Sequence, residues 1–219
     1  MVFFSSEQLG AGYFAQIEIA LEELQTNLNS KEFAGRTFHK DNFMNKQIGK
    51  IISDLGNLRV IASRISSDQD GLEINLDIKS LYIFGKIFIE SVVYLCSVFF
   101  PDNRINWTKL GLFCQTAEQN QASQENEFKK FWDALGVTFK KLQEEFQYRN
   151  HLTHEKRSTV EWTFSRPGHD NLDNTRIQNL TWHEDPNKKG AETTTPRETI
   201  NILNHDVSKI IQYINNNTA

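Results

Sequence analysis

The chain has 219 residues, which fits a single domain and is long enough to bury a large apolar core. Hydrophobic residues make up 38% of the chain and aromatic residues 11%, which argues against disorder over most of its length. The net charge of −4 argues against a protein that coats nucleic acid through bulk positive charge, but it leaves room for one local phosphate pocket.

The predicted elements begin with two helices. Apolar residues recur at three- and four-residue steps over residues 6–28, which predicts the first helix. Asp41 is suited to cap a second helix, whose apolar stripe covers residues 43–65. Residues 66–71 predict a turn, and their acidic residues match a calcium-binding loop only in part.

Residues 81–100 are strongly apolar, and we predict that they form a central core helix that begins after Asp77 and ends before Pro101. A membrane span is the alternative. Lys86 and Glu90 lie near the middle of this run, and each costs about 2.5–3.5 kcal/mol at the centre of a membrane helix. We therefore predict no contact with a membrane. Because the two charges lie four residues apart, we interpret them as a mutual ion pair at the edge of a bundle.

The second half of the chain begins with a short helix expected over residues 106–117 and a loop over residues 118–125. The strongest helical pattern follows, over residues 127–154. Alternating apolar residues then predict two strands, over residues 158–165 and 176–182, that pair as a small β-hairpin.

The last helix has a clear predicted start after a polar linker. Thr195 is a good N-cap, Pro196 suits the first helical position, and Glu198 completes a capping box.

Cysteine usage and the N-terminus indicate a cytoplasmic protein. Cys96 and Cys114 lie in apolar surroundings and outside any C-x-x-C pattern, which favours buried, reduced thiols, although a disulfide between them stays open. The first residues have neither the basic stretch nor the long apolar run of a secretory signal.

The chemically richest segment is residues 148–155, at the C-terminal end of the long predicted helix. Arg149 offers a planar guanidinium that suits phosphate oxygens. His154 lies where the helix dipole favours a charged imidazole. An ideal helix places these two residues about 140° apart around its axis. For both to act on one atom, the helix must end or distort near His154, the arginine must wrap around, or a second copy must supply half of the site.

The pattern R-N-x-x-x-H, formed by Arg149, Asn150 and His154, resembles the signature of the HEPN superfamily of nucleotide-binding domains. The resemblance covers residues 5–156 and implies a bundle of four or more helices. Many members are metal-independent ribonucleases whose sites form across a homodimer, so it implies RNA as substrate, a second copy as partner and no cofactor. Toxins of this family that pair with nucleotidyltransferase antitoxins typically have a tyrosine two residues after the histidine. This chain has Lys156 there, which does not favour that subtype.

The resemblance also implies a role for each residue of the motif. His154 moves a proton, either from the 2′-hydroxyl of the RNA or to the leaving oxygen. Arg149 stabilises the charge that grows on the phosphate, and Asn150 positions one of these groups by hydrogen bonds. The residues that we expect to contact the substrate are Lys86, His151, Lys156 and Arg157.

Each of these residues also has a structural interpretation that involves no catalysis. In that interpretation, Arg149 pairs with Glu145 four residues earlier as a solvated helix contact, and His154 ends the helix by bonding a carbonyl. Lys86 belongs to the ion pair described above rather than to the wall of a cleft. His151 and His154 match neither the H-E-x-x-H zinc arrangement nor its inverted form, so we predict no metal site.

We predict a single, mainly α domain. A HEPN-like helical bundle occupies residues 1–156, a small β-hairpin insertion and linker occupy residues 157–194, and a C-terminal helix over residues 195–219 packs on the bundle. The expected function is that of a homodimeric endoribonuclease in a toxin or defence system, with a cognate antitoxin or another protein as a further partner. The alternative is a non-catalytic HEPN-like module that binds a nucleotide, RNA or a protein through its hairpin.

Overall fold

The structure is a computed structural model that describes residues 12–30, 42–67, 71–121, 125–154, 160–162, 171–178 and 193–218. Most of these residues are helical, as the sequence predicts. The helices are α1 (Ala15–Ser30), α2 (Asn42–Ser66), α3 (Gly71–Phe99), α4 (Leu110–Gln119), α5 (Asn126–His154), α6 (Asn171–Asn174) and α7 (Pro196–Thr218). The strands are β1 (Val160–Trp162), β2 (Thr175–Gln178) and β3 (Thr193–Thr194).

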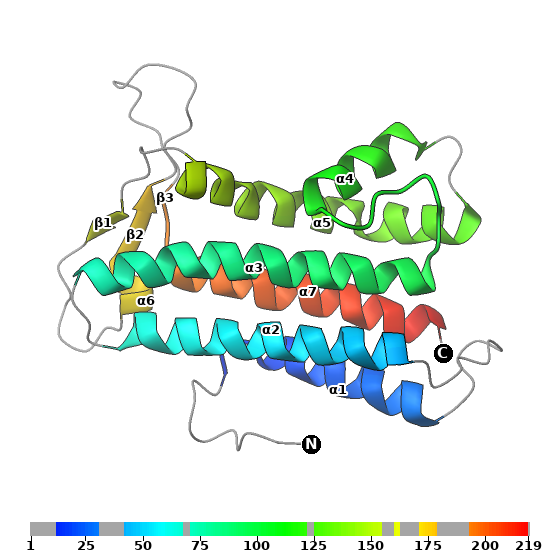
Figure 1. The fold of residues 1–219 in the computed structure, drawn as a ribbon, viewed down its shortest axis with the longest axis horizontal. Coiled ribbons are helices and arrows are strands. Elements are labelled where there is room, and N and C mark those ends of the chain that lie inside the picture. The colour runs from blue at the N-terminus through cyan, green and yellow to red at the C-terminus, as the bar shows by residue number, and fades with distance from the viewer. Residues whose placement is uncertain are drawn as a thin grey trace.

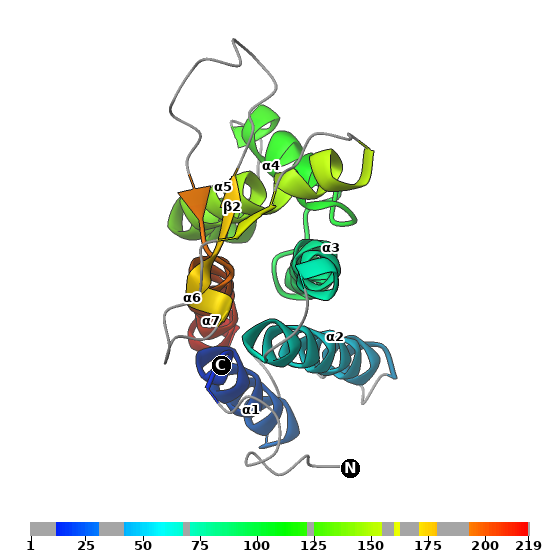
Figure 2. The same cartoon turned by 90° about the vertical axis from the view of Figure 1, so that its left-hand side faces the viewer.

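The long helices form a layered bundle with α3 and α7 in its middle. Figure 1 and Figure 2 both place α1 and α2 on one side of this pair and α4 and α5 on the other. Along the chain, α2 packs on α3, α1 packs on α7, and α5 contacts both α3 and α7. Because α3 and α5 run in opposite directions, the C-terminal end of α5 lies beside the first half of α3 (Figure 1).

The prediction of a central, largely buried α3 is confirmed. Leu81, Phe88, Ile89 and Val92 are all fully buried. Among the described residues, α3 is also the one helix long and apolar enough to cross a membrane, and 56% of its most apolar stretch is buried inside the protein. A core helix has the same length and composition, and the contacts of α3 with α2, α5 and α7 are those of a core helix.

The start of α3 differs from the prediction. The helix begins at Gly71 rather than after Asp77, so that Asp77 lies inside its second turn. Asp77 is buried, and its Oδ2 lies 3.1 Å from Nε of Arg64 on α2. The carboxylate therefore links two helices and does not cap one. Burial raises the pKa of Asp77, and the charge of Arg64 opposes that rise.

The boundaries of the short helix α4 and of the first helix also differ from the prediction. The short helix begins at Leu110, not at residue 106, and it extends to Gln119, into the predicted loop. The backbone amide of Asn106 donates a hydrogen bond to Thr116 Oγ1 at 3.0 Å, which holds the preceding loop back against α4. The first helix begins at Ala15, and the residues before position 12 lie outside the described ones, as does the predicted cap Asp41.

The short strands form an antiparallel sheet in the order β1-β2-β3. Val160 pairs with Ile177, and Ile177 in turn pairs with Thr194 of β3. This arrangement differs from the two-stranded hairpin expected over residues 158–182, because α6 lies between β1 and β2 and a third strand is added. The third strand leads directly into α7.

Candidate functional site

The motif lies at the end of α5, which is helical without interruption from Asn126 to His154. Phe146 is the last residue of α5 whose burial is described, and its buried ring lies against α3. Because the helix continues through both Arg149 and His154, a distortion between them is not what brings the two residues together. Two of the three ways to bring Arg149 and His154 to one atom therefore remain: a long arginine side chain that wraps around the helix, or a second copy of the chain.

The predicted site residues are described to different extents. Lys86 is described in full and lies half-exposed on α3. Only the backbone of His151 is described, because the side chains of residues 147–154, and so those of the whole motif, lie outside the described part of the chain. Lys156 and Arg157 lie outside the described residues altogether.

The two motif positions lie on different sides of α5. Glu145 contacts α7 through a hydrogen bond, and Lys140 forms an ion pair with Glu118 of α4. On an ideal helix, the Arg149 position falls between those of Glu145 and the buried Phe146, and the His154 position falls about 140° away. The helix by itself therefore does not direct both positions to one side.

A polar cluster lies one turn before Arg149, where α3, α5 and α7 meet. Thr199 Oγ1 of α7 donates a hydrogen bond to Glu145 Oε1 at 2.6 Å. The hydroxyl of Tyr82 on α3 lies 3.1 Å from Thr199 Oγ1 and 3.5 Å from Glu145 Oε1. Burial raises the pKa of Glu145, and the hydrogen bonds from Thr199 and Tyr82 oppose that rise because they favour the carboxylate.

This cluster corrects one interpretation and adds residues that the sequence did not indicate. Glu145 is not a solvated partner on an open helix surface, because it is half-buried and hydrogen-bonded to α7. Its position beside the buried Phe146 is the one sequence feature that could have suggested this. No local pattern links it to Tyr82 and Thr199, which lie 63 and 54 residues away.

The predicted ion pair between Lys86 and Glu90 is wrong. No ion pair joins these two described side chains, and Glu90 Oε1 instead accepts a hydrogen bond from the backbone amide of Leu110 at 3.4 Å. Glu90 thus satisfies an amide at the start of α4, where negative charge is favourable. Lys86 lies one turn beyond Tyr82 on α3, away from the direction in which α5 ends.

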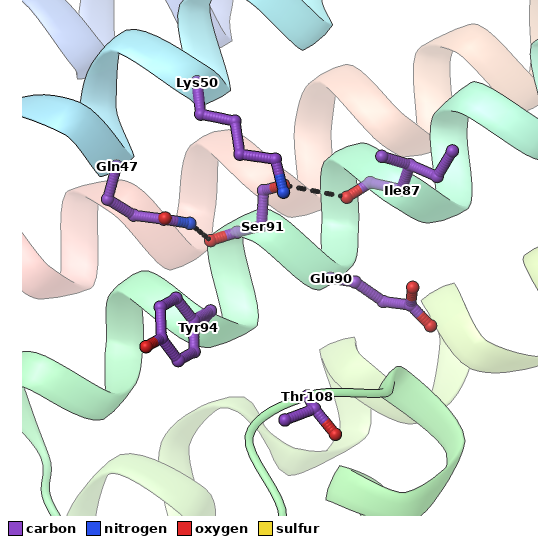
Figure 3. Close-up of a pocket in the computed structure, with 7 residues that line it drawn as sticks. All are labelled: Gln47, Lys50, Ile87, Glu90, Ser91, Tyr94 and Thr108. Carbon is purple, nitrogen blue, oxygen red and sulfur yellow. Dashed lines mark hydrogen bonds between the residues drawn. The ribbon is translucent and has the colours of Figure 1, made fainter.

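An open pocket of about 260 Å³ lies between α2, α3 and the loop before α4, on a part of the bundle that holds no motif residue (Figure 3). Gln47 Nε2 donates to the carbonyl of Ser91 at 2.8 Å, and Ser91 Oγ donates to Asp54 Oδ2 at 3.0 Å. Lys50 and Glu90 line the pocket with opposite charges. These internal bonds join α2 to α3, so the pocket borders a packing junction of the bundle.

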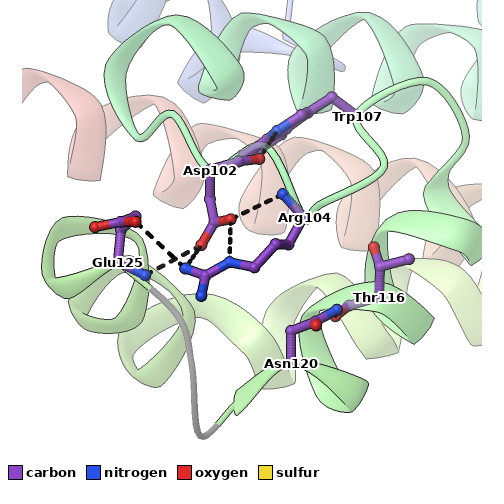
Figure 4. Close-up of polar contacts among 6 residues, drawn as sticks. All are labelled: Asp102, Arg104, Trp107, Thr116, Asn120 and Glu125. Carbon is purple, nitrogen blue, oxygen red and sulfur yellow. Dashed lines mark hydrogen bonds and ion pairs between the residues drawn. The ribbon is translucent and has the colours of Figure 1, made fainter.

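A second polar cluster closes the loop between α3 and α4 (Figure 4). Asp102 is buried and accepts hydrogen bonds from Nε and Nη2 of Arg104 at 2.9 and 2.8 Å. It also accepts one from the backbone amide of Glu125 at 3.1 Å, next to the start of α5. The hydrogen bonds from Arg104 lower the pKa of Asp102 to about 2. The cluster joins the loop before α4 to the residue that precedes α5, and it contains no motif residue.

The described part of the chain contains neither a group of metal-ligating side chains nor a reactive thiol. No group of three or more His, Cys, Asp or Glu residues there is arranged to hold a metal ion. Cys96 and Cys114 are free and buried, so the disulfide that the sequence left open is not formed. Burial raises the pKa of both thiols, that of Cys114 to about 12, which makes them unreactive.

Comparisons of the chain with known protein families, curated proteins and solved structures found no match.

Proposed function

We propose that this chain is a HEPN-type, metal-independent endoribonuclease of the cytoplasm that acts as a homodimer in a toxin or defence system. The observation that carries the proposal is the course of α5. The helix includes the whole R-N-x-x-x-H pattern and ends at His154, at one end of a helical bundle. The pattern thus lies where a second copy could meet it.

The proposed chemistry is attack of the RNA's own 2′-oxygen on the adjacent phosphorus, with departure of the 5′-oxygen. His154 either takes the proton from the 2′-hydroxyl or gives a proton to the leaving oxygen. Arg149 stabilises the additional negative charge on the phosphate oxygens, and Asn150 orients one of these groups by hydrogen bonds. The products end in a cyclic or 3′ phosphate, and DNA resists because it lacks the nucleophile. His151, Lys156 and Arg157 contribute contacts to the substrate.

The proposed dimer is motivated by the spacing of the motif on one helix. An ideal helix places Arg149 and His154 about 140° apart around its axis. Of the two routes that remain, a long arginine side chain or a second copy, we favour the second copy. In such a dimer, a two-fold axis brings Arg149 of one α5 to His154 of the other.

The test is cleavage of a labelled RNA by the wild type and by His154→Ala and Arg149→Ala, with His205→Ala as the matched control. His205 is an exposed histidine on α7, held by Asp206, and it lies outside the motif. We expect losses of roughly 10²–10⁴-fold for the motif variants and wild-type rates for the control, with no effect of chelators. If the purified wild type binds RNA without cleaving it, or if His154→Ala cleaves equally well, the chain is a binding module instead.

A further inference from the structure

The pocket between α2, α3 and the loop before α4 presents two opposite charges that do not neutralise each other. Lys50 reaches into it from α2, and Glu90 extends from α3 toward α4 (Figure 3). Within the described part of the chain, no ion pair joins these two side chains, and Lys50 forms none with any other residue. The pocket therefore offers both a cation and an anion to a ligand.

The carboxylate of Glu90 is held at the pocket and keeps one oxygen for a ligand. Its Oε1 accepts the hydrogen bond from the backbone amide of Leu110, whereas no group in the described part of the chain bonds its Oε2. Because the side chain is half-buried, water screens its charge less than it would at an open surface. An ammonium group on a ligand is the counter-ion that this carboxylate lacks.

The buried base of the pocket is already ordered without a ligand. Gln47 is buried and donates to the carbonyl of Ser91, whose Oγ lies 3.0 Å from both Asp54 Oδ2 and the carbonyl oxygen of Ile87. The carboxylate of Asp54 thus has its own donor and does not compete with Glu90 for a ligand. A lining that is fixed before binding reduces the entropy that a ligand has to overcome.

The rest of the lining suits a small molecule with an apolar part. The side chain of Ile87 and the ring of Tyr94, which is 38% exposed, line the pocket together with the hydroxyl of Thr108. The volume of about 260 Å³ lies just below the roughly 300–1,000 Å³ of pockets for drug-sized ligands. A ligand for this pocket is therefore small, and it carries an apolar group beside its charges.

We propose that this pocket binds a free α-amino acid with an apolar side chain. The carboxylate of the ligand pairs with Lys50, its ammonium group pairs with Glu90, and its side chain packs on Ile87 and Tyr94. A purely anionic ligand is repelled by Glu90 and a purely cationic one by Lys50, so a zwitterion is the class that matches both charges. The inference goes beyond the proposed RNA cleavage and does not depend on it, because the pocket holds no residue of the motif.

The probe for this site is L-leucine, titrated into the full chain and followed by calorimetry and by the NMR shifts of the Gln47 and Ser91 backbone amides. Two analogues of leucine each remove one charge: leucinamide lacks the carboxylate, and 4-methylpentanoate lacks the ammonium group. We expect leucine to bind with a Kd of about 0.1–1 mM, as suits so small a ligand in an open pocket. Each analogue should bind about tenfold more weakly or worse.

Variants of the two charged residues assign each end of the ligand. Lys50→Met should remove the preference for leucine over leucinamide, because the carboxylate loses its partner. Glu90→Gln should remove the preference for leucine over 4-methylpentanoate, and the glutamine can still accept the hydrogen bond from the Leu110 amide, so the fold is kept. The control is Lys46→Met, an exposed lysine one turn before Lys50 that does not line the pocket, and it should bind leucine as the wild type does.

Three results overturn the inference. The first is an absence of heat and of amide shifts with about 10 mM leucine, ten times the weakest expected Kd. The second is an analogue that binds the wild type as tightly as leucine does, because the pocket then does not select a zwitterion. The third is leucine binding that Lys50→Met and Glu90→Gln leave unchanged, because the ligand then lies elsewhere on the protein.

Discussion

Asp102 shows how a single buried carboxylate closes a loop. Its side chain is fully buried, and its charge is satisfied by Arg104 and by the backbone at the start of α5. A depressed pKa means that the carboxylate stabilises the folded state above the pKa of the unfolded chain, near 3.9. That stabilisation is lost as the pH falls through about 2, the value in the folded protein.

Asp102→Asn should therefore lower the free energy of unfolding by roughly 2 kcal/mol at pH 7, since one pKa unit corresponds to about 1.4 kcal/mol. Urea unfolding between pH 7 and pH 2 measures the effect, and the difference between variant and wild type should shrink toward pH 2. The control is Glu125→Gln, whose side chain is 69% exposed and should change stability little. A difference that stays constant over this pH range would contradict the assignment.

Gly85 permits the close approach of α3 and α5 just before the motif. A Cβ atom at this position would overlap the ring of Phe146, which is fully buried. Gly85→Ala should therefore destabilise the protein by about 1–3 kcal/mol despite the helix-favouring nature of alanine. Gly49→Ala on α2, where nothing lies within 4 Å of the added atom, should be neutral or stabilising. Thermal unfolding compares the two, and equal effects would mean that α5 does not pack as described.

At the scale of elements, the capping box predicted for the last helix is confirmed. The Thr195 backbone amide donates to Glu198 Oε2 at 2.8 Å, and the Glu198 amide donates to Thr195 Oγ1 at 3.2 Å. Thr195→Ala should cost about 1 kcal/mol of stability by urea unfolding. Thr26→Ala is the control, at an exposed threonine of α1 whose hydroxyl donates to the carbonyl of Glu22 in the same helix. If the two variants are equally stable, the cap does not contribute to α7.

Periodicity in the sequence predicts the long helices well, because each buries one stripe of apolar side chains. It predicts α5 through His154 and the buried course of α3. It fails at Asp77 and Glu90, whose roles depend on Arg64 and on the amide of Leu110 in other elements. The cluster around Glu145 is missed for the same reason, since its partners come from two other helices.

At the scale of the whole molecule, α5 ends with the motif at one end of the bundle. α3 and α7 form the middle, and α5 lies on the outside of this pair. An ideal helix places Arg149 and His154 about 140° apart on α5, and the site that we propose takes one of them from each of two chains.

The most direct measurement of this claim is complementation between two inactive variants. Arg149→Ala and His154→Ala proteins are unfolded together, refolded as a mixture and assayed for RNA cleavage beside each variant alone. If each site takes its arginine from one copy and its histidine from the other, a mixed dimer holds one intact site. The mixture should then regain about a quarter of the wild-type rate, since random pairing makes about half of the dimers mixed. A mixture as inactive as its components, beside an active wild type, would contradict the composite site.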